Sequence, residues 1–347
     1  MPALIECVPN ISEGCDPAVV DQIVQAAKSA GVSIIDIYCG AGTNRSVITM
    51  AGDPTAIAEG AFRLIKRAAE LIDMRKHRGT HPRMGATDVC PFIPLRDATM
   101  ELCIDIARRL GERVAHELNI PVYLYEEAAL SAERRALPYV RKGGYEALVK
   151  RIEDPHMQPD FGSIDRENPA GATAIGARPF LVAYNVNLAT ASVETAKAIA
   201  QRLRKQGAGA KSAPGERVDG LNAPAPHGRF SRMRALGWFI EEFGRAQVST
   251  NILDFEHTPV FAVYEEVDRL ARELGTKAEG SEIVGLVPIE AVLASGRHFA
   301  AKASLPVERL SEEELIELAI KALGLSQQHY FSPREKILEY RLREMGV

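Results

Sequence analysis

Hydrophobic and polar positions along the first hundred residues change repeatedly between strand-like and helix-like spacing. Apolar residues at helical spacing follow Asp16 and Pro17, a capping pair, and predict a helix that ends near Gly31. A second amphipathic helix is predicted at 55–71. The strands predicted around these helices span 3–8, 33–37, 46–51 and 89–95. The resulting order, β-α-β-β-α-β, is the split unit of ferredoxin-like sandwiches.

The same order of elements recurs in the second half of the chain. Strands are predicted at 180–185, 234–241, 247–255 and 282–288, and helices at 192–206 and 258–274. The repetition predicts an α+β protein with two ferredoxin-like subdomains, 1–178 and 179–347. Each subdomain leaves one sheet face to be buried, so we expect the faces to meet each other or a second subunit, with a ligand cleft between the subdomains.

Segments with weaker patterns lie between and after these two sets of elements. Helical segments are predicted at 99–118, 132–141, 145–152, 290–293 and 312–323, and a strand at 121–125. Prolines and glycines predict an irregular segment at 154–178, whose glycine-rich end lets a backbone approach a ligand closely. The stretch 207–229, rich in glycine, alanine and proline, predicts a flexible insertion.

Composition narrows the class of protein. With 46% hydrophobic and 25% charged residues, the chain is a typical soluble globular one, long enough for two domains. A net charge of −4 without a basic stripe disfavours nucleic-acid binding, and no apolar run is long enough for a bilayer. The N-terminus lacks a basic segment before an apolar run, so no secretory signal is expected. Five scattered cysteines indicate reduced thiols in a cytoplasmic protein, with Cys7 and Cys90 as buried small hydrophobes.

The loop at 77–91 is the first place to look for chemistry, because it concentrates histidines and arginines between two regular elements. His81 is the leading catalytic candidate, since a histidine can act as a general base or acid near neutral pH; the alternative is an exposed histidine without a role. His77, His81 and Asp88 could also be metal ligands, but Gly79 and Pro82 interrupt a helix here, so no metal is expected. His77 is instead predicted to neutralise the C-terminal end of the preceding helix.

Four arginines lie in or beside glycine-rich loops: Arg45, Arg78, Arg83 and Arg178. A guanidinium group binds a carboxylate through two parallel hydrogen bonds, which suits a dicarboxylate or a polyanionic tail. The alternative for each arginine is an ordinary surface ion pair. The sequence contains no serine-hydrolase elbow and no phosphate-binding Walker loop.

Long stretches of the chain resemble the formiminotransferase family. The strongest match is HPRMGATDVCPFIP at 81–94, preceded by IECVPNISEG at 5–14. Further matching stretches are 43–47, 71–77, 121–125, 171–178, 247–255 and 284–288. The resemblance covers nearly the whole chain and implies the two-subdomain, ferredoxin-like fold of that family. The bifunctional members carry a cyclodeaminase domain after this one, for which we expect no room in a chain that ends at Val347.

The resemblance also implies an activity, which is transfer of a formimino group between N-formimino-L-glutamate and N5 of tetrahydrofolate in histidine degradation. It implies tetrahydrofolate as co-substrate, no metal, and a cytoplasmic homodimer; some members use formyl-folate as well. The catalytic histidine of the family falls on His81, and Arg45, Arg83 and Arg178 are expected to bind substrate or folate. The folate-binding loop falls on Ser163, Ile164, Asp165, Arg166, Glu167, Asn168, Pro169, Ala170, Gly171 and Ala172.

The chemistry fits this assignment. A formimino group is an amidine and is readily protonated, so its carbon is electrophilic without a metal. One histidine can take the proton from the attacking nitrogen and give it to the leaving nitrogen through a tetrahedral intermediate. A carboxylate near the cationic carbon would help, and the candidates are Glu6, Asp36 and Asp88.

Three positions depart from the family pattern: Tyr38 stands where an ionisable residue is common, Cys15 where Arg or Lys is usual, and 207–229 is longer than expected. Tyr38 would have to orient His81 through its hydroxyl group, and Cys15 removes a positive charge near the folate. Because of these departures, a second hypothesis is a folate-binding protein with altered or lost catalysis. A transferase that uses 5-formyltetrahydrofolate is a further alternative. A metal-dependent hydrolase is the third hypothesis.

Overall fold

A computed structural model describes residues 3–79, 81–165, 167–204, 230 and 233–346. The chain is a mixed α+β protein that divides into two compact units, each with its own sheet. The first unit comprises Met1–Phe180 and Leu342–Val347, and the second comprises Leu181–Arg341. Both units contain the β-α-β-β-α-β order that the hydrophobic pattern predicts, and the first unit has strands at 10–11 and 173–177 in addition. The predicted insertion at 207–229 lies outside the described residues.

The first unit is built around a seven-stranded sheet. Its strands are β1 (Ile5–Cys7), β2 (Asn10–Ile11), β3 (Ser33–Gly40), β4 (Arg45–Gly52), β5 (Thr87–Pro94), β6 (Val122–Glu126) and β7 (Thr173–Ala177). Its main helices are α1 (Pro17–Lys28), α2 (Pro54–Leu71) and α3 (Met100–Leu118). The sheet order is β1-β4-β2-β5-β7-β6, with β3 paired to the outside of β4. All pairs among β1 to β5 are antiparallel, whereas β7 runs parallel to both β5 and β6.

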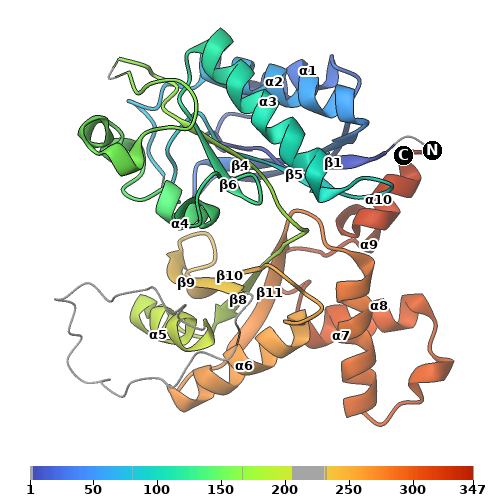
Figure 1. Ribbon diagram of the computed structural model, residues 1–347. Coiled ribbons are helices and arrows are strands. Elements are labelled where there is room, and N and C mark those ends of the chain that lie inside the picture. The colour runs from blue at the N-terminus through green and yellow to red at the C-terminus, as the bar shows by residue number, and fades with distance from the viewer. Residues whose placement is uncertain (1–2, 80, 166, 205–229, 231–232, 347) are drawn as a thin grey trace. The chain divides into compact units, whose positions relative to one another are not determined.

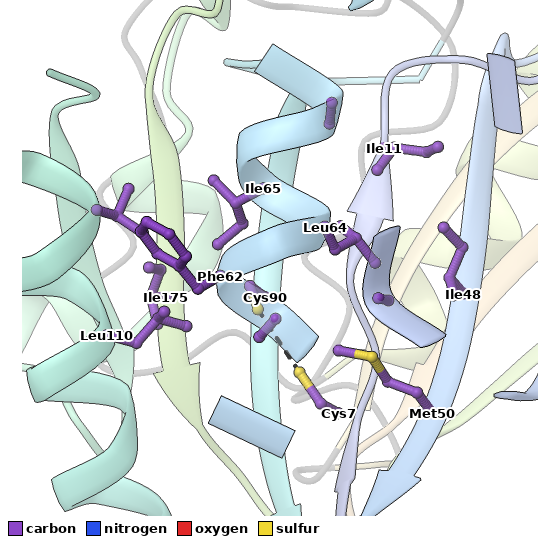
Figure 2. Packing of buried hydrophobic residues seen from close by; sticks show 14 of the residues in the cluster. Cys7, Ile11, Ile48, Met50, Phe62, Leu64, Ile65, Cys90, Leu110 and Ile175 are labelled. Carbon is purple, nitrogen blue, oxygen red and sulfur yellow. Dashed lines mark hydrogen bonds between the residues drawn. The ribbon is translucent and has the colours of Figure 1, made fainter. Parts of the chain in front are cut away.

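The core of the first unit lies between the sheet and its three helices, which cover one face of the sheet (Figure 1). Figure 2 shows Phe62, Leu64 and Ile65 of α2 among side chains of the strands beneath, with the thiols of Cys7 and Cys90 facing each other. The two sulfur atoms are 3.6 Å apart and both residues are fully buried, as predicted. Burial raises the pKa of the Cys7 thiol well above its usual value.

Helix α1 begins where the sequence predicts, because the Asp16 carboxylate accepts hydrogen bonds from the first backbone N–H groups and Pro17 occupies the first turn. Asp53 and Pro54 start α2 in the same way, and Thr99 caps α3. These helices are therefore positioned by local sequence signals, and their apolar faces determine which side meets the sheet.

The prediction that 154–178 is irregular is wrong at its end, where β7 enters the sheet between β5 and β6. The strand, Thr-Ala-Ile-Gly-Ala, has small residues around one isoleucine, and all five are buried. A strand buried on both faces shows no alternation, so the usual strand signal is absent. Gly176 is required because a Cβ atom there would lie 2.5 Å from the Tyr125 carbonyl oxygen.

The two helical segments predicted between β6 and β7 exist only as short pieces. They are η1 (Glu133–Arg135), α4 (Leu137–Val140), η2 (Tyr145–Ala147), η3 (Val149–Glu153) and η4 (Pro155–Met157). Together with the outer side chains of the sheet they form a small second cluster, in which Met84, Tyr125, Val140 and Leu148 are buried. This cluster lies against the segment that carries His81, so it supports the candidate site.

The second unit contains a four-stranded antiparallel sheet in the order β11-β8-β10-β9. Its strands are β8 (Val182–Leu188), β9 (Met233–Ile240), β10 (Arg245–Ile252) and β11 (Ala278–Val284). Helices α5 (Val193–Leu203) and α6 (Val260–Glu273) lie together against one face (Figure 1). Gly237 lets α5 pack closely on β9, because a Cβ atom there would lie 2.3 Å from the backbone of Ala196.

Elements after the second sheet differ from the prediction. Strand β11 begins and ends four residues before the predicted strand at 282–288, and the short helix predicted at 290–293 is the start of α7 (Ile289–Lys302). The predicted helix at 312–323 is confirmed as α8 (Glu312–Leu323), with a capping box from Ser311 and Glu314. Further helical elements are η5 (Val307–Arg309), α9 (Pro333–Lys336) and α10 (Leu338–Glu344). In the described part of the chain, no helix has the length and apolar character needed to cross a membrane.

Candidate active site

Three loops of the first unit are tied together around residues 77–85. Asn44, with a positive φ of 47°, donates from Nδ2 to the Arg78 carbonyl oxygen at 2.9 Å and accepts at Oδ1 from Gly14 N at 3.0 Å. Ser12 Oγ donates to the Gly85 carbonyl oxygen at 2.8 Å. The loop that carries His81 is thus fixed by the strand ends on both sides, which limits where its side chains can lie.

His81 is partly buried, and its ring has a defined tautomer. Its Nδ1 atom lies 2.7 Å from the Pro82 carbonyl oxygen, which can only accept, so Nδ1 carries the proton. Nε2 is then the acceptor nitrogen of the neutral ring. A histidine held in this form can receive a proton at Nε2, which is the first requirement for a general base.

Asp88 forms a buried ion cluster beside this histidine. Its Oδ2 atom accepts from Arg45 Nη1 at 2.6 Å and from Arg141 Nη2 at 2.8 Å, and Oδ1 accepts from Met84 N at 2.9 Å. Asp88 is fully buried, and both arginine side chains are nearly so. Two guanidinium charges oppose one carboxylate, so the cluster keeps an excess positive charge. We call Asp88, Arg45 and Arg141 the charge cluster.

The charge cluster acts on His81. Burial is the largest cause that lowers the pKa of His81, and the positive charges of Arg45 and Arg141 lower it further, to about 3. For Asp88, burial raises the pKa, but Arg141 and Arg45 lower it more, so this carboxyl stays ionised below its usual range. His81 is therefore neutral at pH 7 in the unliganded protein, and the region around it attracts anions.

Arg83 and His77 form a separate structural arrangement. His77 Nε2 donates to the Asn44 carbonyl oxygen at 2.9 Å, and His77 Nδ1 accepts from Arg83 Nε at 3.1 Å. Arg83 also makes a two-point bond to Glu146, at 2.9 and 2.7 Å. The prediction that His77 neutralises the preceding helix is wrong, because α2 ends at Leu71, six residues earlier, and the ring bonds to a loop instead.

Both ring nitrogens of His77 are used in these bonds, so His77 could bind a metal only by giving up one of them. Asp88 is likewise held by two arginines and a backbone N–H group. Among the described residues there is no group of three or more His, Cys, Asp or Glu side chains that could hold a metal ion. The hydrogen bonds of His77 and Asp88 thus argue against the hypothesis of a metal-dependent hydrolase.

The segment 163–172 is joined to the loop of His81 through its backbone. Ala86 N donates to the Ala170 carbonyl oxygen at 2.8 Å, and Ala172 N donates to the Met84 carbonyl oxygen at 3.0 Å. A Cβ atom at Gly85 would lie 2.1 Å from the Ala172 carbonyl oxygen. The glycines of these two stretches therefore allow two backbone segments to approach each other. The sequence analysis instead predicts that they allow a ligand to approach the backbone.

The remainder of 163–172 borders a small pocket. Ile164, Asp165, Asn168 and Gly171 line it together with Tyr145 and its neighbours, and its volume is about 120 Å³. Sites for drug-sized ligands occupy roughly 300–1,000 Å³, so this pocket has room for one part of such a molecule. Of the other residues predicted in this loop, Ser163 and Glu167 are exposed, Pro169 is partly buried, and Arg166 lies outside the described residues.

The structure brings together some of the predicted arginines and separates others. Arg45 belongs to the charge cluster, Arg83 is occupied by Glu146, and Arg78 bonds to the His77 carbonyl oxygen. Arg178 follows β7, where its Nη1 donates to the Pro179 carbonyl oxygen at 3.0 Å. Its charge also acts on the buried hydroxyl of Tyr125.

Arg141 is the member of the site that the sequence did not predict. Arg141 is the last residue of the arginine-rich segment 132–141, which the sequence analysis noted only as helical. It lies 53 positions after Asp88, so no local sequence pattern indicates that the two residues form an ion pair. Its Nε atom is buried and has no acceptor among the residues that the structure describes. Arg141 therefore keeps an unused donor next to the excess charge.

Comparison with known proteins identifies the family of the chain. Residues 4–178 match the family profile of the formiminotransferase domain, N-terminal subdomain, and residues 183–343 match that of the formiminotransferase domain. The chain is 45% identical over 347 residues to the formimidoyltransferase-cyclodeaminase of Rattus norvegicus, of which it spans 61%. It is 41% identical to the glutamate formimidoyltransferases of Streptococcus pyogenes and Thermoplasma acidophilum. These two alignments cover 84% and 86% of this chain, respectively, and 92% of each relative.

A histidine whose pKa is strongly lowered, beside buried guanidinium charge, is a candidate functional site, because perturbed pKa values cluster at such sites. The family matches and the identity to two relatives of similar length give the class of protein. The chain belongs to the formiminotransferase family.

Proposed function

We propose that this protein is a glutamate formimidoyltransferase, which transfers a formimino group between N-formimino-L-glutamate and tetrahydrofolate in histidine degradation. The observation that carries the proposal is His81, neutral and with its Nδ1 proton fixed on the Pro82 carbonyl oxygen, beside the charge cluster. The relatives named glutamate formimidoyltransferase support the same reaction.

In this proposal His81 moves one proton in each direction. N5 of tetrahydrofolate attacks the formimino carbon, a new N–C bond forms, and Nε2 of His81 accepts the N5 proton. The tetrahedral intermediate then loses the glutamate nitrogen, which receives that proton from His81 as the old C–N bond breaks. Protons and bonds balance without a metal, and His81 ends neutral as it began.

The charge cluster has a second role in the mechanism. A histidine whose pKa is about 3 is a weak base, because an efficient general base has a pKa near the working pH. A substrate carboxylate bound by Arg45 or Arg141 would cancel part of the charge that lowers the pKa of His81. We infer that substrate binding raises the pKa of His81 and so turns on its basicity.

We also propose that the segment 163–172 binds folate and that Arg178 contacts its anionic tail. The pocket lined by Ile164, Asn168 and Gly171 supports this role, since it is concave and partly apolar beside the loop of His81. Arg83 is a weaker binding candidate than the sequence suggested, because its guanidinium group is already paired with Glu146.

Asp88 is a poor candidate for stabilising the formimino cation directly, because its oxygens are occupied by Arg45, Arg141 and Met84 N. Glu6 and Asp36, on β1 and β3 with β4 between them, remain the candidates for that role. Whether the Tyr38 hydroxyl orients His81 stays a prediction.

For the architecture, we propose ferredoxin-like subdomains at 1–178 and 179–347 with a ligand cleft between them. The β11-β8-β10-β9 order of the second unit, antiparallel throughout, and the arrangement of β1 to β5 in the first support the subdomain topology. The location in the cytoplasm, the homodimer and the use of 5-formyltetrahydrofolate stay predictions.

Replacing His81 by alanine tests the proposed function. We expect turnover with formiminoglutamate and tetrahydrofolate to fall by at least about 100-fold, because the proton then has no carrier. Folate affinity should change much less. His116→Ala is the matched control, because this histidine is exposed near the end of α3 and should have wild-type turnover.

Near-normal turnover of His81→Ala would contradict the assigned role. Tight folate binding by the wild-type chain without any turnover would favour the folate-binding protein with lost catalysis. Steady-state kinetics together with calorimetric folate titrations distinguish these results.

A further inference from the structure

Arg83 lies two positions after His81, and its main chain and its side chain are both bonded. Its Nε atom donates to His77 Nδ1 at 3.1 Å, and its two terminal nitrogens donate to the Glu146 carboxylate at 2.9 and 2.7 Å. Its carbonyl oxygen accepts from Tyr145 N at 2.9 Å. Tyr145 and Glu146 are consecutive residues of η2, so one short element holds Arg83 at both ends. We call Arg83, Tyr145 and Glu146 the arginine clamp.

The peptide bond that follows Arg83 is fixed on both of its edges. Its carbonyl oxygen accepts from Tyr145 N, and its N–H group, on Met84, donates to Asp88 Oδ1 at 2.9 Å. Gly144 allows this approach, because its φ is +65° and a Cβ atom there would lie 3.0 Å from the Arg83 carbonyl oxygen. Arg83 is thus held in place by residues that lie far from one another in the sequence.

The Pro82 carbonyl group connects the arginine clamp to His81. This carbonyl belongs to the peptide bond that precedes Arg83, and its oxygen is the acceptor that lies 2.7 Å from His81 Nδ1. The proline ring fixes φ of Pro82, so the direction of the carbonyl depends mainly on where Arg83 is held. A displacement of Arg83 would turn the carbonyl away from Nδ1 and release the ring of His81.

Stability alone does not explain the carboxylate of Glu146. Its side chain is 62% exposed, and an ion pair at such a position contributes little to the free energy of unfolding. The two-point bond instead restricts geometry, because the planar guanidinium group of Arg83 meets a carboxylate in one orientation. Since the Nε atom of the same group is bonded to His77, that orientation is transmitted to the loop of His81.

We propose that Glu146 is a positioning residue for His81, an inference that rests on the proposed function. Through Arg83 and the Pro82 carbonyl group, Glu146 keeps the proton of the neutral ring on Nδ1 and leaves Nε2 as the acceptor. An unconstrained neutral histidine can carry its proton on either nitrogen, and the form with the proton on Nε2 cannot accept another one there. Glu146 therefore affects turnover through His81.

Contact with substrate is the competing role for both charged residues of the clamp. Glu146 lines the pocket beside 163–172, and Arg83 could exchange Glu146 for a substrate carboxylate. Either contact would act on substrate affinity, whereas positioning of His81 acts on the chemical step. The Michaelis constants and the turnover number therefore separate the two roles.

Glu146→Ala in the full chain tests the inference by kinetics. We expect kcat with formiminoglutamate and tetrahydrofolate to fall about 10–100-fold while both KM values stay within about threefold, because a small displacement of a catalytic group slows the chemical step. Glu127→Ala is the matched control and should have the kcat of the wild type. Glu127 begins the same connection between β6 and β7, and its ion pair with Arg135 joins two residues of that connection.

The tautomer of His81 is a readout that loss of stability alone would not change. The 15N resonances of its ring at pH 7 distinguish the nitrogen that carries the proton, and they are identified by their loss in His81→Gln. We expect the proton on Nδ1 in the wild type and in Glu127→Ala, but shared between both nitrogens in Glu146→Ala. Glu146→Gln keeps one acceptor for the guanidinium group and should lie between them. Circular dichroism and the melting temperature establish that each variant is folded.

An unchanged kcat in folded Glu146→Ala, or a ring that still carries its proton on Nδ1, would overturn the inference and leave the transferase intact. A raised KM with unchanged kcat would overturn it in favour of a direct substrate contact. The NMR measurement needs no activity. A wild-type chain without turnover would therefore remove the proposed function, while the tautomer would still show whether Glu146 positions His81.

Discussion

Asp88 shows at the scale of single residues how one buried carboxylate arranges a site. Its two guanidinium partners come from β4 and from the end of α4, so the ion cluster connects segments far apart in sequence. A buried charge is tolerated only when it is paired and hydrogen-bonded, as Asp88 is through both oxygens. The sequence showed the charged residues, whereas their pairing depends on the fold.

Asp88→Asn should destabilise the protein by about 3–5 kcal/mol, because two nearly buried guanidinium groups lose their counter-charge. Chemical denaturation followed by circular dichroism measures the change. Asp105→Asn is the control, since its ion pair with Arg109 is exposed and should be worth less than about 1 kcal/mol. Equal effects of the two substitutions would contradict the role given to the charge cluster.

His81 itself should not titrate near its ordinary pKa. Burial and the charges of Arg45 and Arg141 lower its pKa to about 3, so its ring C–H resonance in the NMR spectrum should stay constant between pH 5 and 8. Arg141→Gln should raise that pKa, though to less than 6.5, because burial remains the largest cause. The resonance is identified by its loss in His81→Gln, and a midpoint near pH 6.5 in the wild type would refute the assignment.

At the scale of elements, the site depends on backbone segments that approach without intervening side chains. The loop of His81 meets 163–172 at Gly85 and Gly171, and it meets the β3–β4 turn at Gly79, where a Cβ atom would lie 2.3 Å from the Thr43 carbonyl oxygen. Such approaches need glycine regardless of which ligand binds nearby. A glycine in a motif can thus serve the fold even when the motif is functional.

Gly85→Ala should therefore lower the melting temperature, because the new methyl group would lie 2.1 Å from the Ala172 carbonyl oxygen and separate the two segments. Turnover should fall as well, since His81 lies four positions earlier on the same loop. Gly42→Ala has open space around its Cβ atom and should leave the melting temperature nearly unchanged. Scanning calorimetry measures the melting temperature of both variants. An unchanged melting temperature in Gly85→Ala would mean that the loop of His81 and the segment 163–172 can move apart without loss of stability.

At the scale of the whole molecule, the depressed pKa of His81 links stability to pH. The unfolded chain binds a proton at this ring near pH 6.5, whereas the folded protein does so only near pH 3. Between these values the unfolded state holds more protons, so the free energy of unfolding decreases as the pH falls from 6.5 towards 3. Asp88, whose pKa is lowered, adds stability above its unfolded pKa and loses it at still lower pH.

The expected result is a slope of unfolding free energy against pH that is smaller in His81→Gln than in the wild type between pH 6.5 and 4. Urea denaturation at several pH values measures both slopes. Identical slopes would show that His81 carries an ordinary pKa in the folded state.

The sequence by itself determined the β-α-β-β-α-β order within each unit, the capped start of α1, and the loop of His81, because each of these depends on neighbouring residues along the chain. Only the tertiary structure decided that β7 joins the sheet, that Arg141 shares Asp88 with Arg45, and that His77 bonds to Asn44 and Arg83. The hydrogen bonds that join Gln247 to Asn187, Trp238 and Glu282 belong to the same group, since these residues lie on four strands. Periodicity and capping are local signals, whereas sheet pairing and buried ion pairs join distant residues and leave no local trace.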